Sequence, residues 1–207
     1  MQKKIFLDFE GDNFFERNKA KWFNEKDLVV KKITQLNNKK KIHNLLEIGC
    51  GDGWRLNLIN KKMKINCYGI DPSKKAVKNI NNKKLKIFRG TADKLNFKSI
   101  KFDVVVFGFC LYLVDIQDLI KVVHETDKVL KKNSIIVIYD FHSSNSKILE
   151  YKHNKNVKIH MYDFSKMFLG YPQYKLIEKK IFDMRKNSSK NSKNKKVLTS
   201  ISVIKKS

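Results

Sequence analysis

The chain has little of the material from which linkers, disulfide frameworks and metal sites are built. Its 207 residues include only 8 Gly, 2 Pro and 3 Cys. No Pro- or Gly-rich stretch divides the chain, and its length fits one domain. Cys50, Cys67 and Cys110 are odd in number and widely spaced. We therefore expect a single-domain, reduced, cytoplasmic protein without disulfides and without a metal site.

Long apolar runs are also missing. The longest, such as residues 102–113, is far shorter than a membrane span. Residues 1–10 contain no continuous apolar segment, which argues against a secretory signal. Because 42% of the residues are hydrophobic, the chain can still bury a substantial core. The sequence predicts no membrane partner.

Arginine is scarce in a strongly basic chain. The formal net charge is +25 at pH 7, yet only four of the 45 basic residues are Arg. Nucleic-acid sites favour Arg because its planar group forms paired hydrogen bonds with phosphates and bases. The chain is also rich in Asn and Ile, which share A/T-rich codons with Lys. We attribute most of the charge to biased composition on solvated faces, and RNA binding stays the alternative.

Five short apolar runs alternate with segments of helical spacing. The runs cover residues 45–49, 67–71, 85–89, 102–107 and 135–140. Nearly continuous apolar strands between helices predict a parallel sheet covered on both faces.

The clearest helix follows the fourth run. Its expected buried face shows the spacing of three, four and seven residues that is typical of amphipathic helices. The residues of this face are Ile116, Leu119, Ile120, Val123 and Leu130.

The two ends of the chain differ from this alternation. Residues 12–24 and 25–36 have helical patterns, while 174–184 and 197–205 resemble an antiparallel hairpin joined by a mobile loop at 186–196. The prediction is an α/β, Rossmann-like three-layer sandwich with a mostly parallel seven-stranded sheet and an antiparallel C-terminal hairpin strand. Within the single domain 1–207, we expect three parts. These are a helical N-terminal cap (1–42), a cofactor-binding core (43–141), and an acceptor-side insertion with the hairpin (142–207).

The most informative motif is a glycine-rich turn between a strand and a helix. Gly49, Gly51 and Gly53 follow an apolar strand, and Glu47 precedes the first glycine by two residues. Glycines there let backbone N–H groups and a helix N-terminus approach a ligand. Asp71 ends the next strand about 20 residues on, where nucleoside-binding folds hold the ribose hydroxyls.

These residues resemble the class I S-adenosylmethionine-dependent methyltransferases. Glu47 to Gly53 is similar to their first motif, including Cys50, and Asp71-Pro72 is similar to their second-strand acid. Residues 90–97, with Ala92 and Asp93, resemble the segment whose acid binds the adenine amino group. The fourth and fifth strands complete five landmarks between residues 44 and 141. The resemblance implies S-adenosylmethionine as cofactor, converted to S-adenosylhomocysteine.

Other interpretations of the glycine loop fit less well. A P-loop needs Gly-Lys-Ser/Thr, whereas Gly53 precedes Trp54-Arg55. NAD enzymes use Gly-x-Gly-x-x-Gly, and this spacing is absent. A binding protein without catalysis stays a third hypothesis beside methyl transfer to a small molecule and methyl transfer to RNA. Cys110 has no Pro neighbour, so we expect it to pack in the core rather than act as a nucleophile.

A second, looser resemblance lies before the core. The string Phe14-Phe15-Glu16-Arg17-Asn18 is similar to an aromatic-x-x-Arg-Asn signature of the type-11 methyltransferase branch, some of whose members belong to surface-polysaccharide pathways. The resemblance implies that Arg17 and Asn18 close over the cofactor or the acceptor. An exposed helix position is the alternative for both.

The acceptor is expected at the carboxyl ends of strands four and five, where ligands bind in such sheets. This places Phe109 and Tyr112, after strand four, and Asp140, Phe141 and His142, after strand five, near the acceptor. Phe109 is also a candidate cofactor contact. His142 is the candidate general base, and Tyr112 is the second candidate catalytic residue. We expect methyl transfer by direct in-line displacement to a small polar metabolite, such as a sugar precursor.

Overall fold

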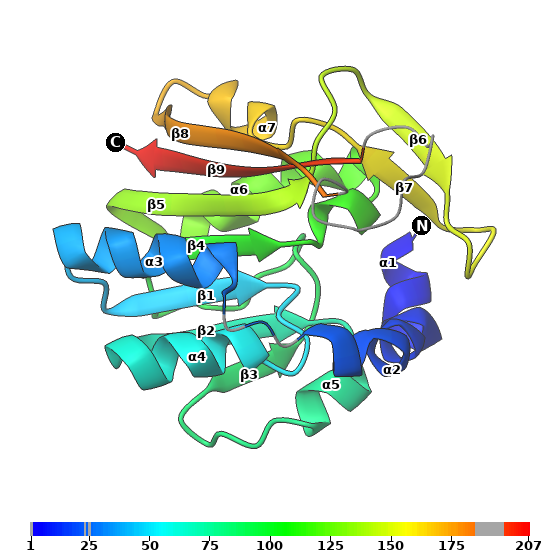
Figure 1. Cartoon of the computed structure of the whole chain (residues 1–207), viewed down its shortest axis with the longest axis horizontal. Coiled ribbons are helices and arrows are strands. Elements are labelled where there is room, and N and C mark those ends of the chain that lie inside the picture. The colour runs from blue at the N-terminus through cyan, green and yellow to red at the C-terminus, as the bar shows by residue number, and fades with distance from the viewer. Residues whose placement is uncertain (1, 23, 25, 185–196) are drawn as a thin grey trace.

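A seven-stranded, mostly parallel sheet forms the centre of the computed structural model, which describes residues 2–22, 24, 26–184 and 197–207 (Figure 1). The strand order is β3-β2-β1-β4-β5-β9-β8. Only β9 runs antiparallel to its neighbours β5 and β8. The strands are β1 (Asn44–Ile48), β2 (Asn66–Asp71), β3 (Lys86–Arg89), β4 (Phe102–Gly108), β5 (Leu130–Phe141), β8 (Tyr174–Asp183) and β9 (Leu198–Lys206). The predicted sheet is confirmed, including its antiparallel C-terminal strand.

Helices cover both faces of this sheet. The sheet separates the two main apolar clusters of the core, one on each face. Helices α3 (Leu28–Lys39) and α4 (Trp54–Met63) pack on one face through residues such as Ile33 and Leu56. Helices α6 (Leu119–Val129) and α7 (Lys166–Leu169) pack on the other, with Val122 and Phe168 fully buried. Figure 1 shows α3 and α4 in front of the sheet and α6 behind it. The three-layer arrangement follows from burying both faces of the apolar strands.

The predicted buried face of helix α6 was partly wrong. The helix begins at Leu119, after a short 3₁₀ turn over Ile116–Asp118. Its buried positions are Val122, Val123, Thr126 and Val129. Ile116 and Ile120 are instead 53% and 71% exposed. The 3₁₀ turn accounts for Ile116, because it changes the angular step per residue. Ile120 lies within the α-helix, on the side roughly opposite to Val122 and Val129.

The N-terminal segment lies beyond the carboxyl ends of the central strands. Helix α1 (Gln2–Ile5) and α2 (Gly11–Trp22) are joined by a π-helical turn at Phe6–Glu10. Figure 1 shows these helices facing the arrowheads of β1 and β4, beside the short helix α5 (Lys74–Lys78). The sequence predicted helices at 12–24 and 25–36 but assigned no structure to the first ten residues.

A second, two-stranded sheet was not predicted. Strands β6 (Lys147–Glu150) and β7 (Lys158–Met161) form an antiparallel hairpin, and β7 lies against the 3₁₀ turn Leu111–Leu113. The expected loop at 186–196 lies outside the described residues. Of the helices in the described part of the chain, none has the length and apolar character needed to cross a membrane.

Candidate functional site

A cavity of about 570 Å³ opens at the carboxyl ends of the parallel strands. Its floor comes from residues that end four strands, namely Ile48, Asp71, Gly108 and Phe141, and its roof from the N-terminal segment. The order of the strands places a crossover between β1 and β4, where ligands bind in open α/β sheets.

The glycine-rich loop forms one wall of the cavity. Gly49, Gly51 and Gly53 have φ values of 74°, 57° and 75°, a left-handed conformation that glycine adopts without strain. The Asp71 carboxylate accepts hydrogen bonds from the N–H groups of Gly51 (2.8 Å) and Ser73 (2.9 Å). Burial raises the pKa of Asp71 to about 6, against the lowering effect of these two donors. Asp71 thus fixes the loop and still faces the cavity.

Asp93 is a second carboxylate, besides Asp71, that lines the cavity. Its carboxylate lies 2.5 Å from the Lys3 ammonium of helix α1, which is also 3.5 Å from Asp118. Burial acts to raise the pKa of Asp93, but the hydrogen bonds from Lys3 and Thr91 and the charge of Lys3 together outweigh it, so the pKa lies below its ordinary value. Pro72, Ala92 and Asp93, three of the expected cofactor contacts, line the cavity.

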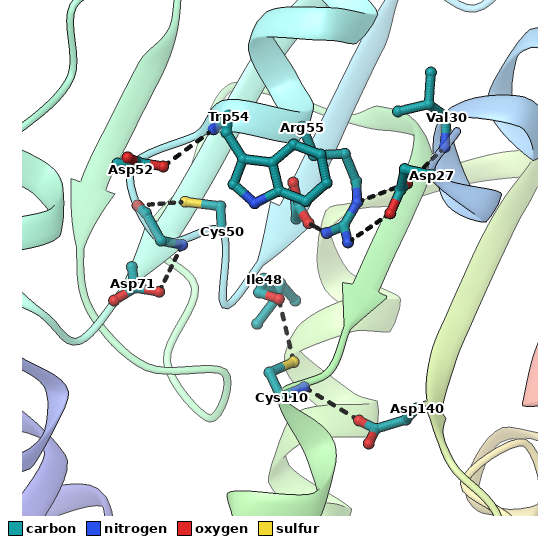
Figure 2. Close-up of polar contacts among 12 residues, drawn as sticks. Asp27, Val30, Ile48, Cys50, Asp52, Trp54, Arg55, Asp71, Cys110 and Asp140 are labelled. Carbon is teal, nitrogen blue, oxygen red and sulfur yellow. Dashed lines mark hydrogen bonds and ion pairs between the residues drawn. The ribbon is translucent and has the colours of Figure 1, made fainter. Parts of the chain in front are cut away.

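A buried ionic cluster lies beside the loop, and Figure 2 shows its members Asp27 and Arg55. Arg55 binds both oxygens of Asp27 at 3.0 and 3.1 Å and donates to Glu47. Glu47 is 1% exposed, and its Oε2 has no hydrogen-bond partner among the described atoms. Burial raises the pKa of Glu47 to about 7 despite Arg55. Glu47 therefore contacts Arg55, which lines the cavity, and does not itself line it.

The loop after β4 is held by a carboxylate on β5. Asp140 accepts hydrogen bonds from the N–H groups of Cys110 (3.1 Å) and Leu111 (2.8 Å), and Figure 2 shows the first of them. The Cys110 thiol donates to the Ile48 carbonyl at 3.1 Å, and burial raises the pKa of this thiol well above its usual value. Phe109 has a φ of 56°, which is uncommon for a bulky residue.

Several predicted residues lie away from the cavity. Arg17 binds Glu10 at 2.5 Å and Tyr151 at 2.8 Å, and Asn18 donates to the Phe14 carbonyl. His142 is 8% exposed and lies near Asp163 and Lys179, with a pKa lowered mainly by burial. Arg17, Asn18 and His142 are absent from the described lining, whereas Phe109 and Tyr112 line the cavity.

The sequence missed other lining residues. Lys3 and Phe6 come from the unassigned first ten residues, and Asp27 comes from the N-terminus of α3. Trp54 was left out of the site but lines the cavity, with the Arg55 guanidinium 4.7 Å from its ring centre. Its position directly after Gly53 of the glycine-rich loop could have indicated that Trp54 belongs to the site.

The cavity suits a nucleoside-containing ligand. Each Asp71 oxygen accepts one backbone N–H, and a carboxylate has about four acceptor positions, so capacity is left for two hydroxyl donors. The glycine backbone forms the adjacent wall without side chains. The fold and this site define the Rossmann-like class of nucleoside-binding α/β domains.

Comparison with known proteins specifies this class further. Residues 46–138 match the family model described as "Methyltransferase domain". No curated protein matches the chain in sequence. This match assigns residues 46–138, which contain the glycine-rich loop, Asp71 and Asp93, to a methyltransferase domain.

Solved structures share the fold. A 1,6-didemethyltoxoflavin-N1-methyltransferase from Burkholderia thailandensis, with S-adenosylhomocysteine bound, is 9% identical with a TM-score of 0.73, covering 96% of this chain and 86% of that one. An S-adenosylmethionine-dependent methyltransferase from Clostridium acetobutylicum is 14% identical with a TM-score of 0.63, covering 95% and 97%. One from Methanosarcina mazei is 17% identical with a TM-score of 0.61, covering 79% and 92%.

Proposed function

We propose that the domain transfers a methyl group from S-adenosylmethionine to a small molecule held in the same cavity. The cavity under the N-terminal helices carries this proposal. Its volume of about 570 Å³ lies within the usual range for small-molecule sites. The Burkholderia neighbour, whose structure contains bound 1,6-didemethyltoxoflavin, supports an acceptor of small-molecule size.

The residues around the cavity supply the contacts that the cofactor requires. Asp71 would accept hydrogen bonds from the ribose hydroxyls, and Asp93 would accept one from the adenine amino group. The backbone of Gly49, Cys50 and Gly51 would hold the methionine part. Pro72, Ala92 and Phe109 contribute packing, while Glu47 acts through Arg55.

The cofactor supplies an activated methyl group, so the protein mainly aligns the acceptor and excludes water. Alignment of this kind contributes about 7–11 kcal/mol to lowering a barrier. Burial raises the pKa of Tyr112 far above its usual value, so its hydroxyl stays protonated and can orient the acceptor as a hydrogen-bond donor. His142 lies outside the described lining, so we assign it no proton transfer.

The two earlier alternatives for the acceptor gain no support from the site. Within the described lining, Lys3 and Arg55 are the only Lys or Arg residues, and both bind carboxylates, which does not favour a polyanionic RNA. The sugar-pathway association rested on Arg17 and Asn18, and the contacts of Arg17 with Glu10 and Tyr151 keep it engaged elsewhere.

Calorimetric titration with S-adenosylhomocysteine tests the cofactor contacts. We expect Asp71→Asn to weaken binding about ten- to a hundredfold, because a hydrogen bond to a charged group contributes about 1.5–3 kcal/mol. Asp103→Asn is the matched control. Asp103 also accepts two backbone N–H groups, from His43 and Asn44, but it is the second residue of β4 and lies at the opposite end of the sheet. Equal affinity in wild type and Asp71→Asn would contradict the assignment, and no binding by wild type would contradict the proposed function.

A further inference from the structure

Aromatic side chains enclose part of the cavity from two sides. Phe109, Tyr112, Tyr139 and Phe141 come from the ends of β4 and β5 and their loops, and Phe6 and Phe14 come from the roof. The sheet-side rings contact one another edge to face. The centre of Phe109 lies 4.6 Å from that of Tyr139 and 5.4 Å from that of Phe141. Such rings present faces and edges on which a planar ligand can stack.

Phe109 is held in a backbone conformation that costs free energy. Its φ of 56° is left-handed, and bulky residues adopt this conformation only where the surrounding structure imposes it. Here the Phe109 N–H donates to the Tyr139 carbonyl at 2.8 Å, and Asp140 fixes the next two N–H groups. The ring of Phe109 is therefore fixed in the cavity wall by the ends of two strands.

The charge in the cavity is opposite to that of the whole chain. The formal net charge of the chain is +25, yet the described lining contains five aspartates, namely Asp27, Asp71, Asp93, Asp115 and Asp118. Lys3 is 2.5 Å from Asp93, and Arg55 binds Asp27 and Glu47. Asp71 and Asp93 are assigned to the cofactor, and Arg55 binds Asp27, so Asp115 and Asp118 are the acids left for the acceptor. A phosphate or carboxylate on the acceptor would be repelled by these two acids, and both lining cations are already paired.

From these observations we propose that the methyl acceptor is a planar aromatic compound without negative charge, bound between the rings at the ends of β4 and β5 and those of the roof. This inference rests on the proposed function and names its substrate class. It departs from the polar sugar precursor that the sequence suggested.

Saturation-transfer NMR on the full chain saturated with S-adenosylhomocysteine tests the proposal. The probes are indole, quinoline and lumazine, with quinoline-2-carboxylate and glucose 6-phosphate as anionic comparisons. We expect transfer to at least one neutral ring compound, and at least threefold less to quinoline-2-carboxylate than to quinoline. No transfer to any neutral ring, or equal or stronger transfer to either anion, would overturn the proposal. Failure of S-adenosylhomocysteine to bind is seen separately and would overturn the proposed function as well.

Phe109→Gly removes one ring without straining the backbone, because glycine tolerates the left-handed conformation. We expect about tenfold weaker binding of the neutral probe to this variant at saturating S-adenosylhomocysteine. Phe9→Ala is the control, since Phe9 is 49% exposed on the same N-terminal segment and outside the described lining. Thermal unfolding of each variant checks that it is folded. Unchanged probe binding in a folded Phe109→Gly, or equal loss in Phe9→Ala, would contradict the role of the aromatic wall.

Discussion

The Asp140 carboxylate holds the loop after β4 from a position only 1% exposed. Burial raises its pKa to about 7 from an ordinary value of 3.8, although backbone donors such as the N–H of Phe141 act against this shift. The folded state therefore binds a proton more tightly than the unfolded state between these two values. Because the unfolded state releases that proton first, the contribution of Asp140 to stability decreases as pH rises through this interval.

We expect the unfolding free energy of wild type, relative to Asp140→Asn, to fall as pH increases from about 4 to about 8. Urea denaturation at several pH values measures this difference. Asp103→Asn is the control, since the pKa of Asp103 is lowered, and a lowered pKa gives a contribution that is constant well above 3.8. A difference for Asp140 that does not change with pH would show that its carboxyl does not titrate in this range.

The N-terminal segment is held in place by its contacts with the turn after β2. The Gly11 backbone is helical, with φ −57° and ψ −46°. An added Cβ would lie 2.6 Å from the Phe6 carbonyl oxygen and 3.1 Å from the Ser73 nitrogen. One residue later, Asp12 accepts hydrogen bonds from the Ser73 hydroxyl (2.7 Å) and the Lys75 N–H (2.8 Å). The segment is thus fixed directly over the turn that carries Asp71.

Gly11→Ala should destabilise the protein by roughly 1–3 kcal/mol through overpacking, although alanine is the better helix former by about 1 kcal/mol. S-adenosylhomocysteine should also bind more weakly, because the roof moves away from the Asp71 turn. Thermal unfolding and calorimetric titration measure the two effects. Asn13→Ala, at an exposed position of the same helix, should leave both unchanged or slightly improve stability. A more stable Gly11→Ala would mean that the segment is not closely packed there.

The whole molecule carries a formal charge of +25, and mutual repulsion at such a net charge destabilises a compact state. Salt screens this repulsion, since the Debye length falls from about 30 Å at 0.01 M to about 10 Å at 0.1 M. We expect the midpoint of thermal unfolding to rise over this range and to level off above about 0.3 M NaCl. Exposed ion pairs weaken in salt, but each contributes only about 0–1 kcal/mol.

A falling midpoint would contradict this expectation. It would mean that ion pairs such as that of Lys131 with Asp103, at 2.7 Å, outweigh the repulsion. A linear rise without a plateau would indicate exclusion of salt from the surface rather than screening.

The sequence by itself determined the features that depend on neighbouring residues. Alternating apolar runs predicted the strands, because parallel strands buried on both faces must be apolar throughout. The glycine spacing and Asp71 predicted the loop, because its left-handed turns favour glycine. The face of α6 was misplaced at Ile116, where a 3₁₀ turn changes the helical period, and at Ile120, which lies on the exposed side of the helix.

Only the tertiary structure decided which distant side chains meet. Arg55 binds Asp27 across 28 residues of chain, and Lys3 reaches Asp93 across 90. Arg17 pairs with Glu10 and Tyr151, and His142 lies outside the described lining of the cavity. A local pattern cannot predict such contacts, because they depend on how whole helices and strands pack. The aromatic wall and the acidic lining arise in this way, from segments whose separate compositions are unremarkable for a basic chain.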